Sequence, residues 1–327
     1  MIKKIKNREF EFFKAQVENE EFIISYFELF ESCFGKREDL NREWYNWFNL
    51  ASPFGKNDIF LVKDLESNQL VSAYGLLPYQ VNYNQKLYPA ALCTNVMVHP
   101  DYRGYGLFVE TGLFALKDSS KKGNKIVIGI PNENAIRGHL KVGWNQLDNL
   151  YFLNINPSLC EDKPLESGIK ELTNYKQLEN ISSFFEKYNY SIVRNKEFIK
   201  WRFLERPNKS YKIFILEEYE KVEGYIVLKK FLDEEQSILK THIVDFGYNQ
   251  IHHLKKLLNT SIYYSKQEKS HLLNMWHLTE ESTEYNCIVS IGFRKTENFN
   301  YFINYSDQIN YDNIHNWHIT LGDNDVY

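Results

Sequence analysis

A strand that leads into a short glycine-bearing loop and then into a helix constrains the fold of this chain more than any other segment. Residues 91–98 (ALCTNVMV) are apolar on both faces, which is typical of a central strand. Residues 103–106 (RGYG) follow as a tight loop, and residues 107–117 have the apolar spacing of a helix. Successive loop amides and the positive end of a helix together favour the binding of a phosphate group.

The length of this loop limits which phosphate ligands it can take. Four residues are too few for a P-loop, and the Gly-Lys-Ser/Thr ending is missing. The three glycines of a dinucleotide fingerprint are missing as well. The sequence therefore disfavours both an ATP-type and an NAD-type site.

The composition indicates a folded chain of more than one domain. The 327 residues include 23 Tyr, 23 Phe and 6 Trp, whereas disordered chains are poor in aromatic residues. A chain of this length favours two domains. The net charge of −4 offers no general attraction to nucleic acid or to an anionic membrane, so we expect neither as a partner. The sequence leaves the oligomeric state open.

The cysteines and the apolar segments indicate a cytoplasmic location. Cys33, Cys93, Cys160 and Cys287 form neither a C-x-x-C motif nor a dense disulfide framework, which favours a reducing compartment. The basic start has no apolar signal-peptide region after it, and no stretch approaches the roughly 20 apolar residues that span a bilayer. We expect a soluble cytoplasmic protein.

The remaining segments give a regular order of elements. The first half is expected to hold amphipathic helix over 8–50, strands over 58–63, 69–77 and 87–91, strand 125–130, a helix that Gly143 stops, and strand 147–155. After a linker candidate at 156–170, the second half is expected to hold helices 175–188 and 195–205, hairpin 211–217 with 222–230, strand 241–246, helix 249–259 and strand 270–278. The order hairpin, strand, helix, strand repeats that of the first half.

The run Val98-His99-Pro100-Asp101-Tyr102-Arg103-Gly104-Tyr105-Gly106-Leu107-Phe108 resembles the acyl-CoA-binding signature of the GNAT superfamily of N-acyltransferases. That signature is Gln/Arg-x-x-Gly-x-Gly/Ala after a central strand that often ends Val-x-Pro. Arg103 and Gly106 match it. Phe108 stands where the family has a small residue, which would tighten or shift the pyrophosphate pocket.

A second family marker lies downstream at the expected spacing. Family members carry an Asn near the start of a helix that ends in an aromatic-containing turn, and this chain has Asn132 and Asn134 followed by residues 139–144 (HLKVGW). The resemblance covers roughly residues 55–155. It implies an α/β (α+β) fold of two GNAT-like domains, 1–158 and 159–327, each a mixed, mostly antiparallel twisted sheet flanked by helices. The first would bind acyl-CoA and the second would shape the acceptor site.

The resemblance also implies acetyl-CoA or another acyl-CoA as co-substrate. Its pyrophosphate would lie on the amides from Gly104 to Val109, and its pantetheine arm would pair with strand 91–98. Amides near Val96–Val98 would polarise the thioester carbonyl. The implied cofactor-binding residues are Val96, Met97, Val98, Arg103, Gly104, Tyr105, Gly106, Leu107, Phe108, Val109, Asn132 and Asn134.

Three residues are candidates for proton transfer. His139 occupies the place where many family members have a Tyr that protonates the leaving thiolate, although it could simply pack on its helix. Asp245 or Asp323 could accept the proton of the attacking amine, with turn or capping roles as the alternative.

Further residues in the second half are candidates for substrate contact. Trp201 and Arg202 resemble a recurrent Trp-Arg of related two-domain proteins, with core packing and a buried ion pair as the alternative. Asp325 belongs to the terminal Trp-x-x-Thr-x-Gly-Asp-x-Asp. Several histidines invite a metal interpretation, but no carboxylate accompanies them at zincin or facial-triad spacing, so we expect no metal site; they are His252, His253, His271, His277, His315 and His318.

The leading hypothesis is an acyl-CoA-dependent N-acyltransferase. Its terminal Trp-x-x-Thr-x-Gly-Asp-x-Asp looks like that of enzymes that modify nucleotide-linked amino sugars for bacterial surface polysaccharides. Two alternatives stay open. One is an aminoacyl-tRNA-dependent ligase of cell-wall bridges, which also duplicates this fold, and the other is a module that binds acyl-CoA without catalysis.

Overall fold

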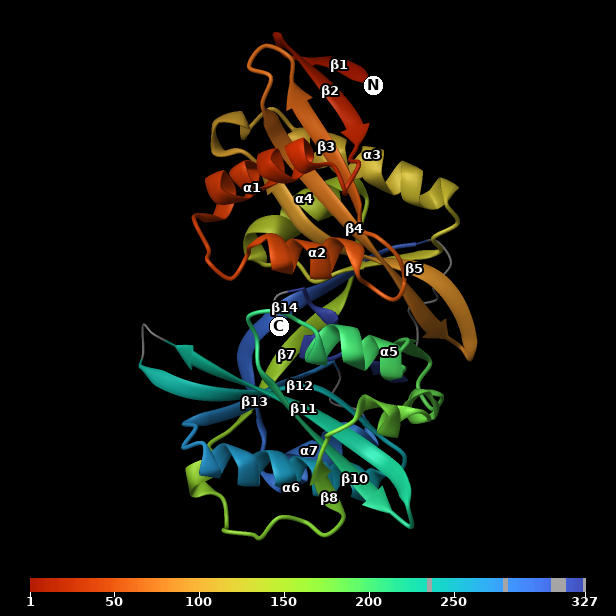
Figure 1. The fold of residues 1–327 in the computed structure, drawn as a ribbon, viewed down its shortest axis with the longest axis vertical. Helices are drawn as coiled ribbons and strands as arrows, with labels where there is room; N and C mark the ends of the chain where they lie inside the picture. The colour runs from red at the N-terminus through yellow and green to blue at the C-terminus, as the bar shows by residue number, and fades with distance from the viewer. Residues whose placement is uncertain (234–236, 279–281, 307–315, 326–327) are drawn as a thin grey trace. The chain divides into compact units, whose positions relative to one another are not determined.

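The computed structural model describes residues 1–233, 237–278, 282–306 and 316–325 (Figure 1). The chain divides into two compact units. The first unit comprises residues 1–81, 87–148 and 301–310, and the second comprises 82–86, 149–300 and 311–327. The change of unit at residue 148 does not coincide with the predicted boundary after residue 158, and that boundary stays a prediction.

The first unit is built around one sheet with the strand order β1-β2-β3-β4-β5-β6-β14. Its strands are β1 (Ile2–Ile5), β2 (Arg8–Lys14), β3 (Asp58–Asp64), β4 (Leu70–Tyr83), β5 (Lys86–Val98), β6 (Ile126–Gly129) and the end of β14 (Arg294–Tyr305). Strands β5 and β6 are parallel, whereas β1–β2, β2–β3, β3–β4 and β6–β14 pair antiparallel. Its helices are α1 (Glu20–Phe34), α2 (Arg42–Leu50), α3 (Leu107–Lys121) and α4 (Glu133–Val142).

The parallel pair at the centre of this sheet separates soon after it forms. Residues Ala90–Leu92 of β5 pair with Ile126–Ile128 of β6, and the ladder ends there. Over residues 93–98, β5 therefore keeps β4 as its one neighbouring strand among the described residues. Because an unpaired strand edge offers backbone donors and acceptors, this stretch can accept an added extended chain.

The N-terminal segment corrects one prediction. Helix was expected over residues 8–50, but residues 8–14 form strand β2. The physical reason is the alternation of acidic residues with Phe10 and Phe12, both of which are fully buried. The helices begin later, where the side chains of Asn19 and Asn41 accept hydrogen bonds from the first-turn amides of α1 and α2.

The main strands of the second unit follow the order β7-β13-β12-β11-β10-β8. Its strands are β7 (Asn145–Ile155), β8 (Ile169–Glu171), β10 (Tyr211–Glu218), β11 (Lys221–Asp233), β12 (Ile238–Tyr248) and β13 (Leu272–His277). Strands β9 (Tyr190–Ile192) and β15 (Trp317–His318) lie outside this order and pair parallel with each other, and β9 also pairs with β4. Strands β12 and β13 are parallel, and the other neighbours pair antiparallel. Its helices are α5 (Lys196–Ile199), α6 (Ile251–Gln267) and α7 (Thr283–Ile291).

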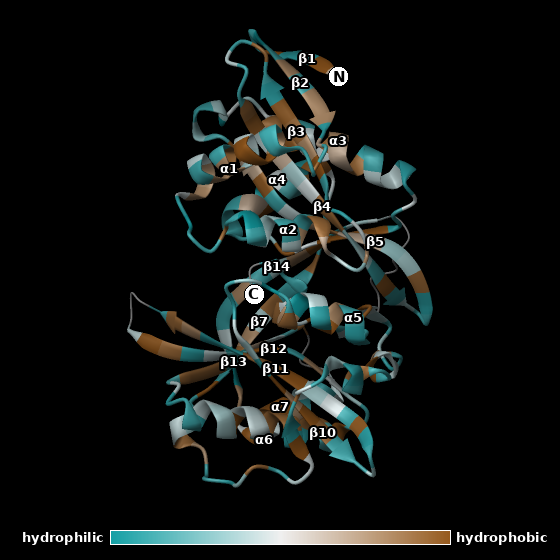
Figure 2. Cartoon of the chain, in the orientation of Figure 1, coloured by the Kyte–Doolittle hydropathy of each residue, from teal (hydrophilic) through white to brown (hydrophobic). Residues whose placement is uncertain are grey.

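The predicted fold class is confirmed, with one further correction. Each unit has a mixed, mostly antiparallel sheet flanked by helices, and the second unit has the predicted order of hairpin β10–β11, strand β12, helix α6 and strand β13. Figure 2 shows apolar residues concentrated in the strands, while the helices alternate between apolar and polar residues. The helix expected over 175–188 is instead two short 3₁₀ turns, at Tyr175–Leu178 and Ile181–Phe185. None of the described helices has the length and apolar content needed to cross a bilayer.

Candidate active site

The loop between β5 and α3 is exposed and open. Gly104 and Gly106 have φ angles of 85° and 79°, a conformation that glycine adopts without strain. A Cβ atom built on either glycine would meet no other atom within 4 Å. The side of the loop next to these glycines therefore has room for a ligand.

The loop amides are free to donate. In the described part of the chain, the N–H groups of residues 104–108 have no hydrogen-bond acceptor. The N-cap residue of α3 is Gly106, which has no side chain that could accept a hydrogen bond from them. The amide of Val109 is different, because it lies 3.1 Å from the carbonyl oxygen of Gly106. The run of available donors is therefore one residue shorter than the predicted run of 104–109, and the helix dipole adds to its positive potential.

Phe108 points toward helix α4. A Cβ on Gly138 would lie 2.5 Å from the Phe108 ring, and the ring centroid of Phe108 lies 5.0 Å from that of His139. Phe108 also packs against the core formed by Tyr74, Trp144 and their neighbours. Its bulk is therefore accommodated by the missing side chain of Gly138.

Contacts with strands β2 and β3 hold the loop in place. Tyr102, just before the loop, donates a 2.8 Å hydrogen bond to Asp64, which also accepts one from Arg8. Tyr105 packs edge-on against Phe10, with ring centroids 5.8 Å apart. Arg103 is exposed. These contacts hold the loop backbone at Tyr102 and Tyr105.

The end of strand β5 borders this loop. The carbonyl of Met97 accepts a 2.9 Å hydrogen bond from Ser72 on β4, so that side of the strand is occupied. Cys33 on α1 lies close to the backbone amide of Val98 and to Arg103. Burial raises the pKa of the Cys33 thiol, and the hydrogen bond with Ser32, followed by these two neighbours, offsets part of the effect. Val96 and Val98 are half-buried.

A group of polar residues beside β5 was not anticipated. Thr94 and Asn57 are 2% exposed, and their Oγ1 and Oδ1 atoms have no hydrogen-bond partner among the described residues. Both lie against Gly75, where an added Cβ would be 2.6 Å from Thr94 Oγ1 and 3.4 Å from Asn57 Nδ2. Asn95 has a φ of 47°, which is rare for a strand residue. The sequence feature that could have indicated this group is the Thr-Asn pair inside an otherwise apolar strand.

His139 is buried, with 4% of its surface exposed. Its Nδ1 lies 3.2 Å from the Tyr74 hydroxyl, and its ring packs against Phe108 and Trp144. Burial lowers the pKa of His139 to about 4, so the imidazole is uncharged at neutral pH. This environment supports the packing alternative, and the acid role stays a prediction.

The two predicted asparagines lie at the start of α4. Asn132 caps this helix by accepting a 3.0 Å hydrogen bond from the amide of Ala135, and Asn134 is exposed. The capping bond gives Asn132 a structural role. Contact of either residue with a cofactor stays a prediction.

Asp245 and Asp323 belong to a buried ion cluster within the second unit. Arg194 donates to Asp245 at 2.9 Å and to Asp323 at 2.7 Å, and all three side chains are fully buried. Tyr225 and Thr320 donate further hydrogen bonds to Asp245. With their oxygens occupied, the two carboxylates hold the C-terminal turn in place. The structure gives no support to the predicted role of either one as a base.

The other predicted residues of the second unit also serve this turn. Arg202 donates to the carbonyl oxygens of Gly322, at 3.2 Å, and Asn324, at 2.6 Å. Trp201 is buried and packs against Phe198, with ring centroids 6.0 Å apart. Burial lowers the pKa of Arg206 to about 10. The half-buried carboxylate of Asp325 opposes this shift, because a nearby negative charge favours the protonated guanidinium. For Trp201 and Arg202 these contacts support the core-packing alternative.

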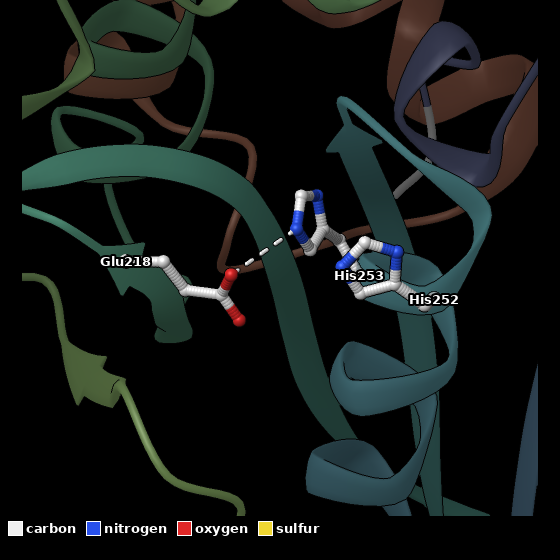
Figure 3. A group of neighbouring side chains, drawn as sticks. All are labelled: Glu218, His252 and His253. Carbon is white, nitrogen blue, oxygen red and sulfur yellow. Dashed lines mark ion pairs between the residues drawn. The ribbon is translucent and has the colours of Figure 1, made fainter.

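One group of side chains in the described residues has ligand atoms close enough to hold a metal ion. Glu218, His252 and His253 place such atoms within 4.8 Å of one another (Figure 3). His253 Nε2 lies 3.5 Å from Glu218, but its Nδ1 accepts a hydrogen bond from the Gln250 amide. An imidazole that binds metal through Nε2 must carry its proton on Nδ1, so this hydrogen bond would have to break. Lys256 also pairs with Glu218, at 2.5 Å. His315 lies outside the described residues.

Comparison with known sequences finds a match in the first part of the chain. Residues 16–146 match the family described as acetyltransferase (GNAT) domain. This range contains the loop, strand β5 and helix α4. No curated protein sequence matches the chain.

Solved structures share the fold over most of the chain. A probable N-acyltransferase of unknown function from Enterococcus faecalis matches with a TM-score of 0.69 at 18% identity, covering 90% of this chain and 72% of that one. A GCN5-related N-acetyltransferase from Anabaena variabilis gives 0.68 at 15% identity, with the same coverages. The N-myristoyltransferase of Saccharomyces cerevisiae with bound myristoyl-CoA gives 0.63 at 12% identity, covering 91% and 79%. At these identities the likeness establishes the fold.

Proposed function

We propose that this protein is an acyl-CoA-dependent N-acyltransferase whose first unit binds the thioester. The observation that carries the proposal concerns the described residues: the amides of residues 104–108 have no acceptor there, and they follow the edge of β5 that has no strand partner over residues 93–98. The match of residues 16–146 to the GNAT domain family and the fold shared with N-acyltransferases support it.

Each part of acyl-CoA has a matching feature in the first unit. The diphosphate accepts hydrogen bonds from the amides of residues 104–108 and lies at the positive end of α3. The pantetheine arm is an extended chain with two amides, and it pairs with the free edge of β5 as an added strand. The thioester then lies near Val96–Val98, whose backbone amides stabilise the developing oxyanion.

The reaction is direct aminolysis. The lone pair of a neutral amine attacks the thioester carbonyl, the C–S bond breaks, and CoA leaves as a thiolate. The attacking nitrogen loses one proton, and the thiolate gains one. A neutral, buried imidazole is a poor proton donor, so we keep His139 as a packing residue in this scheme.

For the acceptor we propose the amine of a nucleotide-linked amino sugar. The support is the resemblance of the terminal Trp-x-x-Thr-x-Gly-Asp-x-Asp to that of enzymes acting on such sugars. In the structure, the cluster of Arg194 with Asp245 and Asp323 fixes this segment. Ordering of the segment is what a recognition element requires.

Two measurements test the proposal in sequence. Acetyl-CoA, or a longer acyl-CoA, should raise the melting temperature, because a ligand that binds only the native state stabilises it. Free thiol should then appear when acyl-CoA is mixed with an amino-sugar nucleotide and should not appear with the corresponding non-amino sugar nucleotide. Absence of any melting shift would refute acyl-CoA binding. A shift without thiol release would refute the proposed acceptor.

A further inference from the structure

A pocket of about 610 Å³ lies within the second unit. It is formed by the end of β7, the segment that follows β7, one face of α6 and the C-terminal turn of α7. This volume falls in the range of pockets that hold small organic molecules. None of the residues assigned to the acyl-CoA site lines it.

The pocket is rich in positive charge, although the chain as a whole has a net charge of −4. Its lining includes Lys163, Lys255, Lys266 and Arg294, and Glu161 is the one acidic residue in the lining among those that the structure describes. Such an excess favours an anionic ligand.

Two of these cations have carboxylate partners, and two do not. Lys266 pairs with Asp162 at 2.5 Å, and Lys163 lies 4.0 Å from Glu161. Lys255 is exposed, and among the described residues it has neither an ion pair nor a hydrogen bond. Arg294 donates only to backbone carbonyl oxygens there, those of Val289 and Phe293. Lys255 and Arg294 therefore keep charge available for a ligand.

Other parts of the lining are apolar. Ile155, Ile262 and Ile291 contribute aliphatic surface, and Tyr263 contributes an aromatic ring. Leu159 also lines the pocket and is 83% exposed, which is high for a leucine. A ligand that covered this surface would gain roughly 25 cal/mol for each Å² of apolar area removed from water.

We propose that this pocket binds a small organic anion, a carboxylate or phosphate carried on an apolar or aromatic body. The anionic group is held by Lys255 and Arg294, and the body lies on the isoleucines and Tyr263. This ligand is distinct from acyl-CoA. Its binding does not depend on the catalytic role of the first unit.

Calorimetry with phenyl phosphate and with octanoate tests the proposal on the full chain. Both titrations are run with CoA present in excess, so that the loop at residues 104–108 cannot account for the signal. We expect at least one probe to bind. Lys255→Glu and Arg294→Gln should each weaken that binding about tenfold or more, since a hydrogen bond to a charged group contributes about 1.5–3 kcal/mol.

Matched controls separate a pocket from surface adsorption. Ser290→Trp places an indole in the pocket from an exposed position and should abolish binding, whereas Ser183→Trp, at an exposed serine outside the pocket, should not. Lys221→Glu controls for the charge change at Lys255. Failure of both probes to bind would overturn the proposal. Retained affinity in Ser290→Trp or in Lys255→Glu, with the melting temperature unchanged, would overturn it equally.

Discussion

Replacing Gly106 with alanine separates the strain of the loop from its role in binding. Gly106 has a φ of 79° and open space where a Cβ would stand. Gly123, at the C-terminal end of α3, offers a matched control, because its φ is 84° and its Cβ position is equally open. Gly123 lies outside the loop. The two substitutions therefore share a backbone cost and differ in the proposed ligand contact.

The two costs can be estimated from the geometry. A non-glycine residue in the left-handed region costs roughly 1–2 kcal/mol, and both variants should lose about this much stability. At Gly106 the added methyl group also stands beside the amides of residues 104–108. If it displaces a diphosphate from two amides, the loss is about 3–6 kcal/mol, because each hydrogen bond to a charged group contributes about 1.5–3 kcal/mol. That corresponds to at least about a hundredfold weaker binding.

Urea unfolding measures the first cost, and calorimetric titration with acetyl-CoA measures the second. We expect similar losses of stability in Gly106→Ala and Gly123→Ala, and weaker acetyl-CoA binding only in Gly106→Ala. Unchanged affinity in both variants would refute the assignment of the loop as the diphosphate site. Equal weakening in both would show that strain, and not contact, governs the binding.

Three further predictions concern stability. Arg194→Met should lower the free energy of unfolding by about 3–5 kcal/mol in urea unfolding, because it leaves buried carboxylates unpaired. Lys212→Met, at an exposed ion pair, should lower it by less than about 1 kcal/mol. Similar losses in the two variants would argue against the ion cluster. The pKa of His139 falls from 6.5 to about 4 on folding, so the unfolded chain binds a proton before the folded one does, and stability falls as the pH drops from 6.5 toward 4. Between pH 7 and pH 5 the free energy of unfolding of the parent should fall by about 2 kcal/mol more than that of His139→Gln. An equal fall in the two proteins would contradict this. Gly138→Ala should lower the free energy of unfolding by about 1–3 kcal/mol, because the added methyl group collides with Phe108. Adding Phe108→Leu to Gly138→Ala should restore part of that stability. If the losses of the two single variants simply add in the double variant, the contact is refuted.

The elements around the loop could be predicted because their signals are local. An apolar strand, a glycine pair and a helical stripe follow one another within residues 91–117, and each is visible within a few positions. The same kind of local reading failed over residues 8–14. There the spacing of Phe12, Phe13 and Val17 imitated a helix, although the alternation of Phe10 and Phe12 with acidic residues was that of a strand.

The chemical roles of distant residues could not be predicted in the same way. Arg194 meets Asp245 and Asp323 across 51 and 129 positions of sequence, so the sequence showed two turn-like aspartates and no partner. His139 stood in the right place on its helix, but its burial depends on Phe108 and Tyr74, which come from two other elements. Long-range packing decides ionisation, and a short motif carries little information about it.

The pairing of β14 with β6 has a consequence for synthesis on the ribosome. Ile303–Tyr305 complete the sheet of the first unit by pairing with Val127–Gly129, and more than 170 residues are translated between the two segments. In the nascent first unit, strand β6 therefore lacks its β14 partner until most of the second unit has been translated. Folding of this protein is expected to finish only after translation has passed residue 305, in contrast to chains whose N-terminal domains close while they emerge.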